Sequence, residues 1–245
     1  MYLPGMIESP SKHVRVEPFP VAGRETPINR AVVLSAALAI IDGEGVEGLS
    51  MRRLGKALDR NPMTLYRYAA NKAALLDGVV ETVLEQLAVD PSDRDWRGQL
   101  HAVAYGYRRL ALEHPNAVPL LVTRPLSTPL GLRPPGTLRY LEAILELLIR
   151  AGFTSEDALH IYRAVFGFLN GHILNELQEI VENPEETDDL LRLGLHRLPL
   201  AEFPRLRSMA TIMAHYDGRD ELERGLAILL EGLATAFPRV SSEDD

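Results

Sequence analysis

Four residues that favour the start of a helix stand at short intervals near the beginning of the chain: Asn29, Ser50, Asn61 and Asn71. The side chain of each can accept a hydrogen bond from a free backbone N–H of the helix that follows, and Pro62 suits a first helical position. Apolar residues recur at helical spacing behind these caps, and the first helix is predicted to end near residues 43–45. The chain is therefore predicted to begin with four closely connected helices.

The second and third of these helices are separated by only a tight turn at residues 59–61. The third is predicted to be short and to cover residues 62–68. Two short helices joined in this way form a helix-turn-helix, whose second helix enters the major groove of DNA. Residues 49–72 carry six basic side chains and one acidic side chain, a local charge of +5 in a chain of net charge −8. A positive island on an acidic body indicates local phosphate binding.

The outward residues of this unit have the chemistry that DNA recognition needs. Arg67 can donate two hydrogen bonds to guanine, and Met63 and the Thr64 methyl group can contact a thymine methyl. Tyrosine and lysine side chains and free helix starts can hold phosphates. The predicted DNA-binding set is Ser50, Arg52, Pro62, Met63, Thr64, Tyr66, Arg67, Tyr68 and Lys72. The alternative is a four-helix cap whose charged face is merely solvated.

The remainder of the chain is predicted to form longer helices and no sheet, because no segment alternates apolar and polar residues. The expected helices cover residues 96–113, 118–123, 137–151, 155 to about 181, 203–215 and 219–237. Prolines make residues 124–136 a predicted loop, and residues 183–200 form a second. The predicted fold is all-α, with a flexible arm at 1–27, a DNA-binding domain at 28–88, a larger ligand-binding and dimerisation domain at 89–237, and an acidic tail at 238–245.

Composition excludes several classes of protein. The chain has no cysteine, which removes disulfides, cysteine-bound zinc, iron–sulfur clusters and thiol nucleophiles. No apolar run reaches the length of a membrane span and the first residues lack a secretory apolar core, so a cytoplasmic protein without a membrane partner is expected. The seven histidines show no ligand spacing, so no metal is predicted. No glycine-rich phosphate loop or acid–base cluster indicates an enzyme, a catalytic residue or a cofactor.

Three stretches in the first third of the chain closely resemble the tetracycline-repressor family of regulators: Gly48-Leu49-Ser50-Met51-Arg52-Arg53-Leu54, Thr64-Leu65-Tyr66-Arg67-Tyr68 and Asn71-Lys72-Ala73-Ala74-Leu75-Leu76-Asp77. The resemblance implies a DNA-binding head on the first four helices and a helical body that binds a ligand and dimerises. One position departs from the family pattern. The turn usually has glycine where this chain has Asp59, which tolerates a left-handed conformation less well.

Segments of the body resemble the tetracycline-responsive branch of that family: Val122-Thr123-Arg124-Pro125, Ala151-Gly152-Phe153-Thr154, Gly167-Phe168 and Gly171. In the sensors of a magnesium–tetracycline complex, a histidine stands three residues before the threonine of Thr-Arg-Pro, and here that position is Leu120. A second pocket histidine is replaced by Ala88 and a metal-associated glutamate by Asn175. The resemblance therefore implies a ligand pocket without the metal–drug site.

Aromatic and polar residues of the body helices are candidates to line such a pocket, which needs apolar walls and a few polar anchors. The candidate effector residues are Tyr105, Tyr107, Leu120, Arg124, Tyr140, Phe166, Asn170 and Asn175. For any single one of these residues, ordinary core packing is the alternative.

Paired glycines suggest where helices approach closely, because each glycine weakens its helix. The candidates are Gly167 and Gly171 on one predicted helix and Gly225 and Gly232 on the last. The resemblance implies that two C-terminal helices of each subunit form a four-helix dimer interface, although packing within one subunit explains the glycines equally well. The need for two recognition helices one DNA turn apart favours a homodimer on a pseudo-palindromic, double-stranded operator.

The leading hypothesis is a repressor that an unknown small-molecule effector releases from its operator. Effector binding in the body would favour a conformation with lower affinity for DNA. The first alternative is a regulator that a protein partner controls, or one without any ligand control. The second is a helical enzyme, for which the sequence offers no assembled set of catalytic groups.

Overall fold

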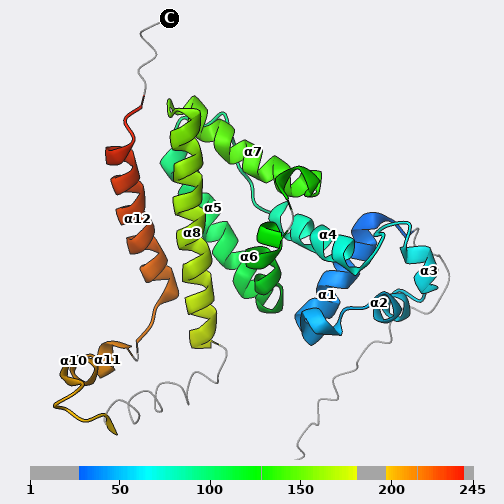
Figure 1. Ribbon diagram of the computed structural model, residues 1–245, viewed down its shortest axis with the longest axis horizontal. Helices are drawn as coiled ribbons and strands as arrows, with labels where there is room; N and C mark the ends of the chain where they lie inside the picture. The colour runs from blue at the N-terminus through cyan, green and yellow to red at the C-terminus, as the bar shows by residue number, and fades with distance from the viewer. Residues whose placement is uncertain (1–27, 128, 181–196, 214, 240–245) are drawn as a thin grey trace, which may run out of the picture.

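The computed structural model describes residues 28–127, 129–180, 197–213 and 215–239, and the regular elements in these ranges are all helices (Figure 1). The predicted all-α class is confirmed. The helices are α1 Arg30–Gly48, α2 Met51–Ala57, α3 Pro62–Leu65, α4 Lys72–Leu84, α5 Trp96–Glu113, α6 Val118–Ser127, α7 Pro135–Arg150, α8 Ser155–Ile180, α10 Pro204–Ser208, α11 Ala210–Met213 and α12 Gly218–Ala236, with single 3-10 turns at Pro115–Ala117 and Leu130–Leu132.

The four predicted caps are all formed at the starts of α1 to α4. Each side-chain oxygen accepts a hydrogen bond of 2.8–3.1 Å from a backbone N–H: Asn29 from Val32, Ser50 from Arg53, Asn61 from Met63 and Asn71 from Ala74. The predicted end of α1 near residues 43–45 coincides with a break in the helix and not with its last residue. Gly45 has a φ of 73° and interrupts the helix there, but helical structure resumes and extends to Gly48. Local capping therefore sets where these helices begin.

The third helix is shorter than predicted. It ends at Leu65, and residues 66–68 continue as a hydrogen-bonded turn in which the N–H groups of Tyr68 and Ala69 both donate to the Leu65 carbonyl. The Tyr68 bond spans three residues, so the chain tightens here instead of continuing as an α-helix.

Two predictions about the body were also wrong. The expected loop at 124–136 is shorter than predicted, because α6 continues to Ser127 and α7 already begins at Pro135, with a 3-10 turn at Leu130–Leu132 between them. Within a helix a proline loses its own N–H bond and crowds the carbonyl four residues earlier, a cost that α6 tolerates at Pro125, whereas Pro135 at the first position of α7 loses no bond. The expected helix at 203–215 is divided into α10 and α11 at Met209. The predicted arm at 1–27, most of the loop at 183–200 and most of the tail at 238–245 lie outside the described residues.

The first four helices form a head at one end of the molecule, and α5 to α12 form the body (Figure 1). The head is held by fully buried side chains from three helices, including Ile41, Leu54 and Leu65. Helix α4 packs on α1 and also on α6 and α7, whereas α8 packs against α5, α7 and α12. Helix α4 therefore contacts both the head and the body, and α1 of the head also packs on the 3-10 turn at Pro115–Ala117. No helix in the described ranges has the length and apolar character to cross a membrane.

Candidate nucleic-acid interface and internal cavity

Helices α2 and α3 approach each other closely because α2 has a glycine, Gly55, where it faces the turn and the start of α3. A Cβ atom on Gly55 would stand 2.8 Å from the Arg60 carbonyl oxygen and 3.0 Å from Pro62 Cγ. The Gly55 carbonyl accepts a 2.9 Å hydrogen bond from the Arg60 N–H. Asp59, in the turn between them, has a φ of 51°, which is the left-handed conformation expected at this position. The sequence contains the expected turn, but the contact role of Gly55 was not predicted.

The predicted DNA-binding residues lie on the outer side of this unit. Met63 is 72% exposed and Tyr66 is 44% exposed, so α3 presents its apolar and phenolic groups to solvent instead of to the core. The exposed members of the set are Ser50, Arg52, Met63, Tyr66 and Arg67, and the half-buried members are Pro62, Thr64, Tyr68 and Lys72. This surface joins base-reading groups to phosphate-binding groups.

Tyr68 has a structural bond that the sequence did not reveal. Its hydroxyl donates a 2.7 Å hydrogen bond to the carbonyl oxygen of Ile28, just before α1. The Arg67 guanidinium lies 5.6 Å from the centre of the Tyr68 ring, within the range of a cation–π interaction. Tyr68 therefore anchors α1 to the recognition turn, and its hydroxyl has no proton left to donate to a phosphate. The predicted phosphate contact by this hydroxyl conflicts with that bond.

The basic side chains of the head remain mostly unpaired. Arg53 forms an ion pair with Glu44, and this hydrogen bond holds the pKa of Glu44 below its usual value. Within the described ranges, no carboxylate forms an ion pair with Arg52, Arg67 or Lys72. The surface around α3 thus keeps positive charge that a DNA phosphate can neutralise.

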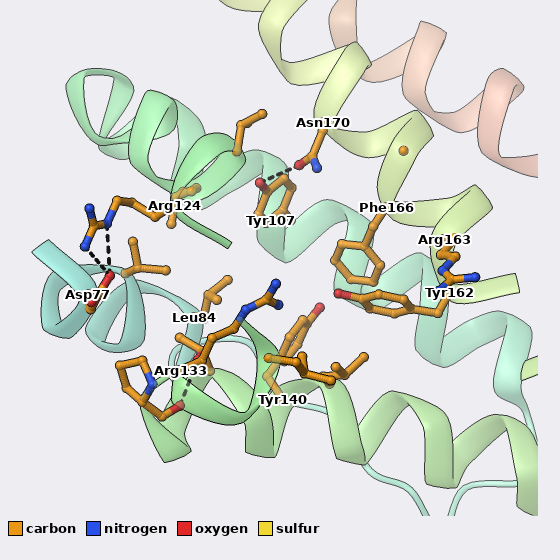
Figure 2. Close-up of a pocket in the computed structure, with 18 of the residues that line it drawn as sticks. Asp77, Leu84, Tyr107, Arg124, Arg133, Tyr140, Tyr162, Arg163, Phe166 and Asn170 are labelled. Carbon is orange, nitrogen blue, oxygen red and sulfur yellow. Dashed lines mark hydrogen bonds and ion pairs between the residues drawn. The ribbon is translucent and has the colours of Figure 1, made fainter. Parts of the chain in front are cut away.

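The body contains a cavity of about 560 Å³ between α4, α6, α7 and α8, with Tyr107 of α5 at one side (Figure 2). Five of the eight predicted effector residues line it: Tyr107, Arg124, Tyr140, Phe166 and Asn170. The lining residues that sequence reasoning missed include Asp77, Leu84, Arg133, Tyr162 and Arg163. Tyr162 stands four residues before Phe166, so helical spacing from that candidate was a signal that could have found it.

Aromatic rings from three helices form one wall of the cavity. Phe166 stands at the centre, with ring centroids 6.3 Å from Tyr107, 5.8 Å from Tyr140 and 4.7 Å from Tyr162. Burial raises the pKa of all three tyrosines, so each is a neutral phenol near pH 7. The Tyr107 hydroxyl donates a 2.8 Å hydrogen bond to Asn170 Oδ1. The buried Tyr140 hydroxyl has no hydrogen-bond partner in the described part of the chain.

Three predicted effector residues lie elsewhere. The Tyr105 hydroxyl is 3.3 Å from Glu223 of α12, on a different face of α5 from Tyr107. Leu120 is buried in the core, and Asn175 is exposed on α8. Two residues along a helix correspond to about 200° of rotation, so Tyr105 and Tyr107 cannot both face one cavity.

The four predicted interface glycines fall into different surroundings. Gly167 lines the cavity, and Gly225 packs within the subunit, where a Cβ atom would lie 2.6 Å from the Phe168 ring. Gly171 and Gly232 are exposed, and a Cβ atom on either would meet nothing within 4 Å. Packing inside one subunit therefore accounts for Gly225 but not for Gly171 or Gly232.

Helix α4 is connected to the body through Asp77 and Glu81. Arg124 of α6 donates to Asp77 Oδ1 at 2.9 Å and 2.6 Å, and to the Ala73 carbonyl oxygen at 2.9 Å. The buried Glu81 carboxylate accepts from the Gly136 N–H at 2.9 Å and from Arg30 at 2.7 Å. A change in the spacing of α4, α6 and α7 therefore has to strain or break specific bonds.

The titratable cluster outside the cavity is an ion pair and not a set of metal ligands. His172 Nε2 lies 3.4 Å from Glu176, one turn further along α8, a histidine–carboxylate spacing that sequence reasoning overlooked. Arg108 already donates hydrogen bonds to both oxygens of this buried carboxylate. Across the described residues, no three metal-ligating side chains are grouped.

Two family models match most of the chain. The family described as "Bacterial regulatory proteins, tetR family" matches residues 33–79, and "Tetracyclin repressor-like, C-terminal domain" matches residues 89–237. The tetracycline repressor protein class C of Escherichia coli is 30% identical over 212 residues, which cover 84% of this chain and 90% of that protein. An HTH-type transcriptional regulator of Saccharopolyspora erythraea is 28% identical over 230 residues, covering 92% of this chain and 89% of its own.

Solved structures of similar proteins share this arrangement of helices. ActR from Streptomyces coelicolor, in complex with actinorhodin, superimposes with a TM-score of 0.72 at 27% identity, covering 87% of this chain and 98% of that chain. The apo form of ActR gives a TM-score of 0.70 over 86% of this chain and 96% of that chain. A head with a positive outer face and a body with an internal cavity are thus found on a known regulatory fold.

Proposed function

This chain belongs to the tetracycline-repressor family of bacterial transcriptional regulators, and we propose that it represses an operator and leaves it when a small molecule fills the cavity. Its relatives are regulators of transcription and not enzymes. The proposal has a DNA-binding part and a ligand-binding part, each with its own observation in support. We place its action in the cytoplasm, where a bacterial operator lies.

The DNA-binding part is supported by the outer face of α3. Met63 and Thr64 lie on α3 and Arg67 lies in the turn after it, and no described carboxylate forms an ion pair with Arg67, Arg52 or Lys72. One such unit reads a half-site, and a homodimer with two of them one DNA turn apart reads a pseudo-palindromic operator. Helices α8 and α12 are the candidate interface, because Gly171 is exposed on α8, and Gly232 is exposed on α12 one turn after Ile228, which is 75% exposed.

The ligand-binding part is supported by where the cavity lies. Asp77, Val80 and Leu84 of α4 line it, so a molecule inside it contacts the helix that directly follows the recognition turn. A ligand that fits one position of α4 better than another shifts the population toward that position. ActR has been solved with actinorhodin, which supports a small-molecule ligand for this chain as well. Control by a protein partner, or no control, would leave a cavity of this size without a role.

The test compares the binding of Arg67→Ala, Lys72→Ala and wild-type protein to an operator selected from genomic DNA. Arg67→Ala is expected to lose about 1–3 kcal/mol on the best operator and to accept other bases at one position, because a base contact is removed. Lys72→Ala is expected to bind all sequences more weakly and to reduce the salt slope by about 1, because a phosphate contact is removed. The matched control is Arg97→Ala, which removes an exposed positive charge at the start of α5 in the body.

Binding is measured by fluorescence anisotropy over a range of salt concentrations. The control should bind as wild type does. If all four proteins bind the operator with the same affinity and salt slope, the outer face of α3 does not read DNA.

A further inference from the structure

The aromatic wall of the cavity favours a flat ligand with several rings. Tyr107 comes from α5, Tyr140 from α7, and Tyr162 and Phe166 from α8, so the rings are fixed by three separate helices. Aromatic rings prefer offset or edge-to-face contacts with other rings, and each contact adds to the gain from burying apolar area. A cavity of about 560 Å³ lies in the size range of sites for drug-sized molecules.

The polar groups beside this wall are mainly hydrogen-bond donors. Tyr140 is only 9% exposed and its hydroxyl has no partner among the described residues. The polar ends of Tyr140, Tyr162 and Arg133 turn toward the same space (Figure 2). Arg133 is close enough to Tyr162 that its charge offsets part of the rise in that tyrosine's pKa, and Tyr140 is influenced by Tyr162. Two phenol hydroxyls and a guanidinium therefore converge at one end of the cavity.

Acceptors are scarce in the same lining. Asp77 is the carboxylate among the lining residues, and Arg124 already donates two hydrogen bonds to it. Asn170 Oδ1 already accepts from Tyr107. An amine or another cation would lose its hydration in a cavity whose lining already carries the positive charges of Arg133 and Arg163, which is unfavourable. An oxygen anion would find its donors in place.

We propose that the cavity takes a flat, fused-ring aromatic acid whose ionised oxygen is held directly by Tyr140, Tyr162 and Arg133. The rings of the ligand lie against Phe166 and its neighbours, and the anion lies where the donors converge. The donors hold the anion directly, and the Arg133 guanidinium would repel a divalent cation. The ligand therefore binds without a bridging metal ion. The inference rests on the proposed function because it assumes that the cavity is the effector site. What it adds is the chemical class of the ligand.

The test uses the full chain and two ligands of nearly the same shape: anthraquinone-2-carboxylate and the neutral anthraquinone-2-carboxamide. Isothermal titration calorimetry should show the carboxylate binding at least about ten-fold more tightly, since a hydrogen bond to a charged group contributes about 1.5–3 kcal/mol and each 1.4 kcal/mol is ten-fold. Tyr140→Phe and Arg133→Met should each reduce this preference to below about three-fold while the carboxamide affinity changes little. EDTA should leave both affinities unchanged.

A second measurement separates ligand binding from folding. Tyr140→Phe removes only a buried hydroxyl without a partner, so the thermal midpoint of the ligand-free protein should stay the same or rise. A tyrosine with a purely structural role would lower the midpoint and leave the ligand preference unchanged. Tyr105→Phe, on another face of α5, is the matched control and should alter neither ligand affinity.

The outcomes distinguish this inference from the proposed function. Equal affinity for the two anthraquinones, preference for the carboxamide, loss of carboxylate binding in EDTA, or no binding of either at millimolar concentration would each overturn the ligand class. Operator binding by the same wild-type preparation is measured in parallel. If the operator is bound and the carboxylate is not preferred, repression stands and only the ligand class fails. If no operator is bound, the proposed function fails whatever the anthraquinones do.

Discussion

The buried carboxylate of Glu81 connects three helices, and replacing it tests how strongly the head is attached to the body. Glu81 is 4% exposed and accepts from the Gly136 N–H at the start of α7 and from Arg30 of α1. In Glu81→Ala the Gly136 N–H is left without this partner, at about 1–3 kcal/mol, and the lost side chain leaves a cavity. The Arg30 side chain is half-exposed, so water can replace its bond. We expect a total loss of about 3–5 kcal/mol in the free energy of unfolding.

Glu81→Gln separates the two contributions. The glutamine amide oxygen can still accept from Gly136, so only the charge and the stronger bond to Arg30 are lost, about 1–2 kcal/mol. The alanine variant should therefore be less stable than the glutamine variant by about 2 kcal/mol.

The assay is urea unfolding followed by circular dichroism at one fixed protein concentration, because the stability of a dimer depends on concentration. The matched control is Glu85→Ala, four residues further on and exposed just after the end of α4, which should change stability by less than about 0.5 kcal/mol. Equal stabilities for the alanine and glutamine variants, or a loss below about 1 kcal/mol in Glu81→Ala, would show that this carboxylate is not the connection described.

Three further predictions concern the turn and the glycines. Asp59→Gly should raise the free energy of unfolding by about 0.5–1 kcal/mol in the same urea assay, because its φ of 51° suits glycine better; a loss would contradict the strain argument. Gly55→Ala should lower operator affinity more than ten-fold in the anisotropy assay, because the new Cβ would push α2 from the turn; unchanged affinity would show that the head tolerates the shift. Gly225→Ala should destabilise the subunit by about 1–3 kcal/mol through the Phe168 ring, whereas Gly232→Ala should stabilise the helix yet weaken the dimer in analytical ultracentrifugation. A dimer unaffected by Gly232→Ala would place the interface elsewhere.

The parts of the fold that depend on neighbouring residues could be predicted from the sequence. A cap such as Asn61 bonds to an N–H only two residues away, and α5 begins and ends at the predicted residues 96 and 113. The ends of α1 and α6 differ from the prediction because they do not depend on neighbouring residues alone. Gly45 carries an irregular φ inside a helix that continues, and α6 continues through a segment that was predicted to be a loop because of its prolines. Packing against the rest of the molecule can maintain a helix that local propensity would end.

The candidate site was predictable only in part, because a cavity is formed by helices that are distant in sequence. Tyr105 and Tyr107 are the same residue type on the same predicted helix, yet of the two only Tyr107 lines the cavity. Arg133 lies in a segment assigned to a loop, and nothing local marks it as a lining residue. Tyr68 has a hydroxyl that could contact a phosphate, but the hydroxyl binds the carbonyl oxygen of Ile28, which lies 40 positions away in the sequence.

The position of α4 limits how this protein can be rebuilt from parts. A chimaera that joins a foreign head to this body at the predicted boundary of residues 88 and 89 would lose the native α4, and with it Asp77 and Glu81. Arg124 and the Gly136 N–H would then lose the Asp77 and Glu81 carboxylates to which they donate hydrogen bonds. The foreign head could bind its own operator with normal affinity, yet ligand in the cavity would no longer move it. A chimaera that still responds to ligand must therefore keep the native α4 residues that contact α6 and α7. The part of the protein that responds to ligand thus includes one helix of the predicted DNA-binding domain.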